Sequence, residues 1–309
     1  MNPARVAVVI PARDEAESIA RVIDSWQAHD YDGPLRVFLI DDHSSDGTSD
    51  IARKTIAGSP RFQLLQAPEK PAGWTGKLWA VQQGVEASRS FNPDFILFTD
   101  ADIVHDPGTL RSLLAKTGTY DMVSLMVRLH CETLPERALI PAFVFFFFLL
   151  YPPRRGNGAA GGCMLVRRST LERAGGIGSI RGELIDDCAL AAAIKRAGGR
   201  VYLSLAESSY SLRVYSTFGE IGHMIARTAY SQLRYSPLLL IGTLLALAAV
   251  PLYWLPMAIL YAPMLRHYRQ SRLWLLALPA IVLFYGGATL LSAIRYYQGR
   301  GGQWKGRTL

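Results

Sequence analysis

Short apolar runs rich in β-branched residues alternate with longer, partly polar stretches over the first 210 residues of the chain. The short runs predict five strands, at residues 6–10, 37–40, 95–99, 122–127 and 201–205. Helical spacing of the apolar residues between them predicts helices at residues 15–28, 49–56 and 78–88. This alternation is typical of βαβ units around a mainly parallel sheet, and it therefore predicts an α/β fold.

The last quarter of the chain has a different pattern, with two long stretches that carry no charge. Residues 238–265 and 273–294 are each long enough to cross the apolar core of a bilayer, which needs about 20 residues. We therefore expect two membrane spans. Pro251, Pro256 and Pro263 interrupt the first stretch, so a kinked span or a re-entrant pair of short helices is the competing geometry.

The charge distribution supports membrane contact. The net charge is +8, no Asp or Glu follows Glu220, and residues 238–309 hold seven of the 33 Lys and Arg residues. Basic and aromatic residues are not interleaved on one face, which argues against nucleic acid as a partner. We expect a globular domain at 1–212, an amphipathic, interfacial connector at 213–237 and a membrane domain with a basic tail at 238–309. A slight positive-inside bias places the globular domain on the cytoplasmic face, as in a bacterial inner-membrane protein.

A third apolar run, residues 138–151, contains four consecutive phenylalanines but is too short to cross a bilayer. It fits equally a helix in the membrane interface and a buried core helix. The three cysteines lack the spacing of a zinc site or a disulfide framework, so a reducing compartment is expected. The first predicted strand begins within a few residues of Met1, and we expect no signal peptide or N-terminal anchor.

Acidic residues directly follow two of the predicted strands. Asp100 and Asp102 come after the third strand, and Asp41 and Asp42 come after the second. Ligands of α/β sheets bind beyond the carboxyl ends of the strands, where two such carboxylates can hold a hard divalent cation together with substrate phosphates. Asp100 and Asp102 can equally form a turn that caps the next helix. Asp41 and Asp42 are costly side by side unless a cation or a hydrogen-bond donor, such as a base N–H or a ribose hydroxyl, meets them.

Three further segments place glycines or charged residues in a loop or at the start of a predicted helix. Lys77 ends a glycine-containing loop, where it can reach a phosphate oxygen, although a surface lysine above packed tryptophans is the alternative. Asp186 and Asp187 begin a predicted helix. Capping explains part of this acidity, but Glu183 adds a third carboxylate, and crowded acids have the raised pKa that suits a general base. Residues 156–161 match GxGxxG without a preceding strand, so we expect a loop near the site and no dinucleotide fingerprint.

The order of these motifs resembles the family 2 glycosyltransferases, whose GT-A fold is a Rossmann-like α/β domain that binds nucleotide sugars. The motifs are VVIPARDE at 8–15, IDDHSSDG at 40–47, GK at 76–77, DAD at 100–102 and DD at 186–187. The chain looks closest to membrane-bound, hopene-associated glycosyltransferases and their carotenoid-modifying relatives, by PAGWTGK at 71–77, QLRYSP at 232–237 and GGQWKGR at 301–307. The QxxRW motif of the processive synthases is absent, which argues against polysaccharide extension.

The resemblance implies a role for each matching residue. It implies a donor-binding wall, a diphosphate site, a metal site for Mg²⁺ or Mn²⁺ and a general base. The donor-binding wall would consist of Pro11, Arg13, Glu15, Asp41 and Asp42. Lys77 would lie by the diphosphate and Asp100 by the sugar, while Asp102, with Asp100 beside it, would hold the metal. Asp187, next to Asp186, would be the general base. The family's usual Glu-Asp pair is Asp-Asp here. His43 and His105 lie near these motifs, and we expect a supporting or solvated role for both.

The resemblance also implies the reaction. The expected enzyme is an inverting, metal-dependent hexosyltransferase that moves a sugar from a nucleoside-diphosphate donor to a membrane lipid, which is hopanoid-like, another isoprenoid or a polyprenyl phosphate. Two alternatives stay open at this stage. One is a non-catalytic, membrane-attached nucleotide-sugar-binding protein, and the other is a nucleotidyltransferase, which also uses paired carboxylates and a metal.

Overall fold

The computed structural model describes residues 3–300, so the GGQWKGR motif and the basic residues Lys305 and Arg307 lie outside the described residues. The strands are β1 (Val6–Ala12), β2 (Leu35–Asp41), β3 (Phe62–Gln66), β4 (Phe95–Phe98), β5 (Ile103–His105), β6 (Met122–Arg128), β7 (Met164–Arg167) and β8 (Val201–Ser211). The helices of the first 212 residues are α1 (Ile19–Gln27), α2 (Thr48–Ile56), α3 (Gly76–Ser88), α4 (Thr109–Leu114), α5 (Leu134–Leu150), α6 (Arg168–Arg173) and α7 (Asp186–Arg196). They are followed by α8 (Phe218–Gln232), α9 (Pro237–Ala248), α10 (Trp254–His267) and α11 (Leu278–Tyr297).

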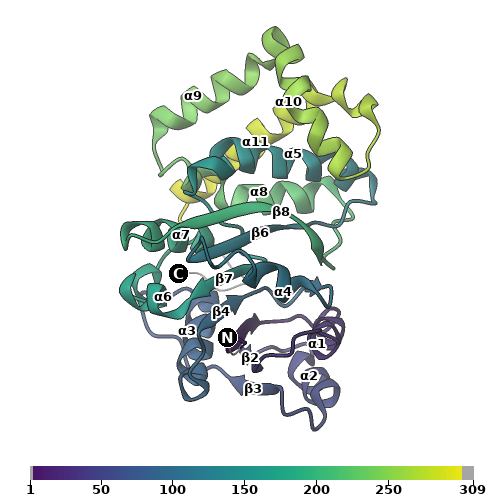
Figure 1. Ribbon diagram of the computed structural model, residues 1–309. Coiled ribbons are helices and arrows are strands. Elements are labelled where there is room, and N and C mark those ends of the chain that lie inside the picture. Colours follow the sequence, from purple (N-terminus) through teal and green to yellow (C-terminus); the bar gives the residue numbers. More distant parts are fainter. Residues whose placement is uncertain (1–2, 301–309) are drawn as a thin grey trace.

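All eight strands form one mixed sheet in the order β3-β2-β1-β4-β7-β6-β8-β5 (Figure 1). Four neighbouring pairs are parallel, and the three pairs β4–β7, β7–β6 and β8–β5 are antiparallel. The expected α/β class is present, but the expected mainly parallel sheet is corrected to a mixed one. The difference arises because β7 runs back between β4 and β6. That strand ends in Arg167 and lacks the uninterrupted apolar run that marks the equally short β4.

Burial of apolar side chains stabilises the central part of the sheet. All seven residues of β1 are buried, because the strand is paired on both edges and covered on both faces. Helix α1 buries Ile19, Val22, Ile23 and Trp26, which share one face at the spacing of a helix. Burying such side chains stabilises the fold by about 1.5–3 kcal/mol each.

A second apolar core joins the sheet to the C-terminal helices. Residues of α5, α8, α10 and α11 pack in it with Met126 of β6 and Leu203 of β8. In Figure 1, α5, α8 and α11 lie above β6 and β8, and α9 and α10 lie farthest from the sheet. Most of the run at 138–151 therefore belongs to a core helix, α5, whose last residues, Leu149 and Leu150, are exposed. The range expected to be a connector contains α8, which buries Ile221 and Ile225 in the same core.

The two uncharged stretches form different structures. By length and composition, α11 alone is long and apolar enough to cross a membrane among the described residues, and 44% of its most apolar window is buried. Helix α9 and the segment 250–267 pass that test only together, and they meet at a bend of 55°. The first stretch is therefore broken, as the prolines allow.

Candidate active site

The candidate site is a cleft of about 910 Å³ at the carboxyl ends of β1 and β4, beside the first turns of α3 and α7. Ligands of such sheets bind at this edge. Of the residues predicted from the sequence, seven line the cleft, namely Pro11, Glu15, Lys77, Asp100, Asp102, Asp186 and Asp187. Glu183 and Gly161 also line it.

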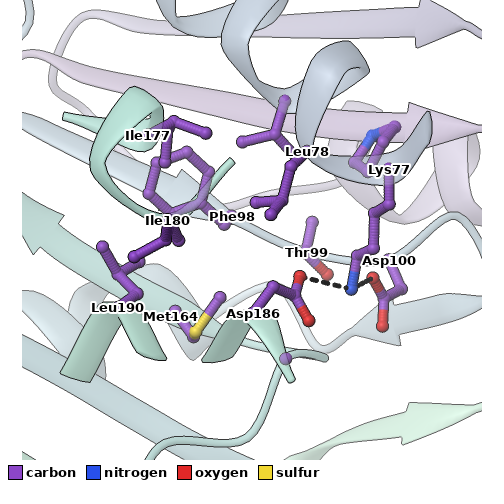
Figure 2. A pocket seen from close by; sticks show the side chains of 13 residues that line it. Lys77, Leu78, Phe98, Thr99, Asp100, Met164, Ile177, Ile180, Asp186 and Leu190 are labelled. Carbon is purple, nitrogen blue, oxygen red and sulfur yellow. Dashed lines mark ion pairs between the residues drawn. The ribbon is translucent and has the colours of Figure 1, made fainter. Parts of the chain in front are cut away.

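Lys77 connects two of the predicted motifs. It lies in the first turn of α3, whose N-cap Thr75 accepts a hydrogen bond from the Leu78 N–H. The Lys77 Nζ lies 2.9 Å from Asp100 Oδ1 and 3.0 Å from Asp186 Oδ2. Figure 2 shows the ammonium group between these carboxylates, at the edge of a pocket with an apolar wall. Burial lowers the pKa of Lys77, but the two carboxylates outweigh it and raise the pKa above its usual value. Lys77 is therefore a fixed positive charge.

Asp187 has the environment of a base. Its Oδ2 accepts a hydrogen bond of 2.9 Å from the Gly161 N–H, and its Oδ1 accepts one of 2.7 Å from the Cys188 N–H. Burial and the neighbouring Asp186 carboxylate raise the pKa of Asp187 to about 6, against the opposing effect of Lys77 and the two N–H groups. A general base works best when its pKa is near the working pH. The loop at 156–161 thus reaches the site and orients this carboxylate.

Asp100 and Asp102 have different partners. Burial is the main cause that raises the pKa of Asp100, and the Lys77 charge opposes it. Asp102 Oδ2 lies 3.1 Å from the Arg213 Nε and accepts a hydrogen bond of 3.2 Å from the Ser211 hydroxyl. Arg213 also pairs with Glu15 at 2.9 Å.

Arg213 was not predicted from the sequence, although it lines the cleft. It follows β8 by two residues, at the sheet edge where ligands of this fold bind. Its position after a strand was the available signal, but only acidic residues were sought at strand ends. Arg213 brings a positive charge to the expected metal-binding carboxylate.

The residues expected at the base and ribose lie at the ends of β1 and β2. Arg13 donates to the backbone carbonyl of Asp42 and lies 3.6 Å from its carboxylate, which is fully buried. Asp41 accepts hydrogen bonds from the backbone N–H and the hydroxyl of Ser44. These three predicted residues do not line the cleft described above. They support the adjacent turn, and their role in donor binding stays a prediction.

Asp46 and His105 have structural partners. Asp46 accepts hydrogen bonds from the N–H groups of Thr48 and Ala16, so turn and capping chemistry explains it. His105 is buried between the hydroxyls of Thr99 and Ser209. Burial lowers the pKa of His105 to about 3, so its ring is neutral.

A divalent cation fits this site only with help from a substrate. Within residues 3–300, no three His, Cys, Asp or Glu side chains are grouped closely enough to hold an ion by themselves. Mg²⁺ commonly binds one or two carboxylates and completes its shell with water and substrate phosphates. Asp102 and Asp100 provide these carboxylates on the wall of the cleft, provided that Arg213 releases Asp102.

The mixed α/β sheet, with its carboxylates at strand ends and a lysine between them, defines a glycosyltransferase of the GT-A type. A profile described as "Glycosyltransferase like family 2" matches residues 3–221. The chain belongs to glycosyltransferase family 2. This membership favours sugar transfer over the nucleotidyltransferase and the non-catalytic alternatives.

Known proteins similar to the chain agree with this class. The chain is 31% identical over 113 residues to an N-acetylglucosaminyltransferase of Rhizobium sp. (strain N33), covering 36% of this chain and 24% of that protein. It is 31% identical over 127 residues to an undecaprenyl-phosphate mannosyltransferase of Micrococcus luteus, covering 38% and 46% of the two chains. It therefore spans less than half the length of these relatives.

A solved structure extends the likeness in fold. Mannosyltransferase PcManGT from Pyrobaculum calidifontis, in complex with GDP-Man and Mn²⁺, has a TM-score of 0.63 and 20% identity, over 97% of this chain and 88% of that one. At this identity the likeness concerns the fold alone, including the region of the C-terminal helices.

Proposed function

We propose that the protein transfers a hexose from a nucleoside-diphosphate sugar to a lipid acceptor at a membrane surface, with inversion at the anomeric carbon. The observation that carries this proposal is Asp187, a carboxylate of raised pKa held by the Gly161 N–H in the same cleft as Lys77 and Asp102. An acceptor oxygen attacks the anomeric carbon while the bond from that carbon to the diphosphate breaks. Where the acceptor is a hydroxyl, its proton passes to Asp187.

Lys77 and the DAD loop provide the charge for the leaving group. The Lys77 ammonium, held between Asp100 and Asp186, faces the place where a diphosphate would lie. Asp102, with Asp100 beside it, would hold Mg²⁺ or Mn²⁺, which neutralises negative charge on the departing diphosphate. The Mn²⁺ in the PcManGT complex supports a divalent cation here. Arg213, which pairs with both Asp102 and Glu15, would keep Glu15 as its partner where Asp102 holds a cation.

The acceptor and the location are inferred from the apolar C-terminal helices. Exposed leucines cover α9 and α10, and one similar relative acts on undecaprenyl phosphate, according to its name. These observations support an isoprenoid-type acceptor and an integral membrane protein whose catalytic part lies on the cytoplasmic face of a bacterial inner membrane. The motifs at 71–77 and 232–237 support the hopene-associated subgroup.

The experiment is a transfer assay with the full chain in detergent. A panel of nucleotide sugars with Mg²⁺ or Mn²⁺ is incubated with a bacterial lipid extract, and the products are followed by mass spectrometry of lipids and by release of nucleoside diphosphate. We expect D102N to lose at least 100-fold in rate with any acceptor, and D187N to do so with a hydroxyl acceptor, since electrostatic and general-base contributions are of this size. The matched control is D24N, an exposed aspartate on α1. Full activity of D102N, or of D187N with a hydroxyl acceptor, contradicts the proposal.

A further inference from the structure

The side chains that line the cleft change from mainly acidic to mainly basic along its length. Acidic residues of the DAD loop and of α7 occupy the end described above. The other end is formed by α8 and by residues at and just after the end of α11, and it contains Arg227, Arg295, Arg300 and His223. Glu220, in the first turn of α8, also lines the cleft, and its carboxylate accepts hydrogen bonds from the Ser216 and Thr217 N–H groups. Among the described residues, none of these three arginines forms an ion pair, whereas Arg213 and Lys77 each hold two carboxylates. These three guanidinium groups outnumber the one carboxylate on α8, that of Glu220, and favour the binding of an anion.

This basic end is adjacent to apolar surface. Phe143 and Phe147 of α5 and Met224 of α8 also line the cleft. Leu290 and Ile294, on the last turns of α11 before Arg295, are each 44% exposed. A ligand that fits both features has an anionic head for the arginines and a long hydrocarbon chain for the apolar surface.

The basic and acidic ends belong to one continuous cavity. His223, Arg227 and Gln232 follow one another along α8 toward the catalytic base. The Gln232 side chain accepts a hydrogen bond from the Tyr151 hydroxyl, and Tyr151 lies close enough to Asp187 for that carboxylate to raise the pKa of the phenol, although burial is the larger cause. An anion held by Arg227 and Arg295 therefore lies on a path that leads to Asp187.

We propose that Arg227, Arg295 and Arg300 bind the phosphate of a lipid phosphomonoester, whose terminal oxygen is the sugar acceptor. This proposal rests on the proposed transferase function and selects, among lipid acceptors, the phosphate-headed class over neutral alcohols. A phosphate oxygen attacks the anomeric carbon, the bond to the nucleoside diphosphate breaks, and the products are a glycosyl phosphate lipid and the free nucleoside diphosphate. The attacking oxygen is already ionised, so no proton leaves the acceptor. Guanidinium groups suit this task because they bind phosphate in a bidentate manner.

The test measures binding without turnover. Full-length protein in neutral phosphatidylcholine nanodiscs is titrated with undecaprenyl phosphate and with undecaprenol, and tryptophan fluorescence reports binding. We expect the phosphate to bind at least 10-fold more tightly than the alcohol. The double variant R227Q/R295Q is expected to lose this preference, while R269Q/R272Q, with the same charge change at exposed arginines outside the cleft lining, is expected to keep it.

Three outcomes overturn the proposal. Equal affinities for undecaprenol and undecaprenyl phosphate show that the arginines do not recognise the phosphate group. Competition by phosphatidylglycerol at equal concentration identifies a general bilayer headgroup, and competition by millimolar inorganic phosphate identifies a free anion. Binding of UDP and GDP to the same variants is measured in parallel. Retained nucleotide binding in R227Q/R295Q shows that the donor end is intact. If the wild type and all variants fail to bind UDP and GDP but the wild type still prefers the lipid phosphate, the proposed transferase function is wrong and the phosphate site is still supported.

The contacts of the C-terminal helices with the rest of the protein indicate how it meets the membrane. Helix α9 begins next to Tyr235, whose ring stacks on Tyr296 of α11 at 4.4 Å. Beyond α10, the Tyr268 hydroxyl accepts a hydrogen bond from the Leu129 N–H, and the Gln270 side chain donates one to the Cys131 carbonyl. Leu129 and Cys131 lie between β6 and α5. Both ends of the α9–α10 pair therefore touch the catalytic body.

Helix α11 also stays with the catalytic body along its length. The Tyr285 hydroxyl donates to the Leu139 carbonyl of α5, and the Ser292 hydroxyl accepts from the Tyr230 N–H of α8. Its end contributes Arg295 to the cleft. A helix that crossed a bilayer away from the catalytic part could not make these contacts at both halves.

Large apolar residues at and near the far tip of the α9–α10 pair are strongly exposed. Leu252 is 89% exposed, Leu245 and Leu255 are 67% and 61% exposed, and no charged residue occurs from 238 to 265. At a rise of about 1.5 Å per residue, α9 and α10 reach about 18 and 21 Å, less than the bilayer core of about 30 Å. The arginines Arg266, Arg269 and Arg272 follow the return of the chain, where headgroups would lie.

We infer that α9 and α10 enter one leaflet and return, so that catalytic domain, Arg269 and the end of α11 share one side of the membrane. The test labels single introduced cysteines with a membrane-impermeant maleimide in inside-out and right-side-out vesicles, with the unsubstituted chain as background. We expect R269C and D24C to be labelled from the same side, and L252C only after detergent is added. Labelling of R269C from the side opposite to D24C, or of L252C from either side of intact vesicles, overturns the inference.

Discussion

Replacement of Lys77 by methionine tests the electrostatic argument for the site. The Lys77 Nζ lies within 3.0 Å of both Asp100 and Asp186, and the lysine side chain is 20% exposed. Removing one partner of a buried ion pair costs about 3–5 kcal/mol. Asp100 is 35% exposed, so solvent screening places the expected loss at about 3 kcal/mol, the lower end of that range. For a chain of this size, such a loss lowers Tm by about 6 °C.

The pKa shifts of the neighbouring carboxyl groups predict how the Tm difference between K77M and the wild type changes with pH. Burial raises the folded-state pKa of Asp100, and burial together with Asp186 raises that of Asp187 to about 6. A carboxyl group with a raised folded pKa destabilises the fold when it is ionised, and protonation relieves this as the pH falls through that pKa. Lys77 itself stays charged throughout this range. The Tm difference between K77M and the wild type should therefore be largest at pH 8 and smaller at pH 5.

Thermal unfolding of the full chain in one detergent, at pH 5, 6.5 and 8, measures this difference. K54M, which removes an exposed lysine on α2, is the matched control and should melt within about 2 °C of the wild type, as is usual for surface changes. If K77M melts as high as K54M at pH 8, or if its deficit is the same at all three pH values, Lys77 does not neutralise the carboxylates in the way described.

Three further predictions concern the same cleft. R213Q should increase the affinity for Mn²⁺ several-fold, measured by electron paramagnetic resonance of the free ion, because the substitution removes the cation that pairs with Asp102; unchanged affinity contradicts this. With a hydroxyl acceptor, the rate should fall with decreasing pH around the pKa of Asp187, about 6, and D186N should move this limb to lower pH because a neighbouring negative charge is removed. An unmoved limb shows that Asp186 does not act on the base. Chelation by EDTA should abolish transfer and restored Mn²⁺ should recover it, whereas activity in EDTA refutes the need for a metal.

Local patterns predicted the strands that carry the site, because each is a short apolar run followed by charged residues. The strands β3, β5 and β7 were missed because each has only three to five residues and includes a polar one, whereas the equally short β4 is wholly apolar. The antiparallel placement of β7 depends on contacts with β4 and β6, far away in the chain. No window of sequence contains that information.

The partners of the site residues were beyond the reach of the sequence for a related reason. Lys77 was expected near a diphosphate, but its two carboxylate partners come from loops that only the fold brings together. Arg213 was missed because nothing near it in the sequence marks it as a partner of Asp102, 111 positions earlier. Residue identity thus predicted which chemistry is present, whereas the pairing of charges required the structure.

The pairing of charges also gives the proposed donor and acceptor ends of the cleft different electrostatic properties. At the acidic end, Lys77 and Arg213 offset carboxylates that would otherwise repel a diphosphate, and a metal ion can take over that role at Asp102. At the basic end, none of the three arginines forms an ion pair with a described carboxylate, and a negatively charged ligand would supply the missing partner. Two anionic substrates could then approach each other across one cavity, with Asp187 between the ends, because each is bound by its own set of cations. A neutral acceptor would leave the basic end unused.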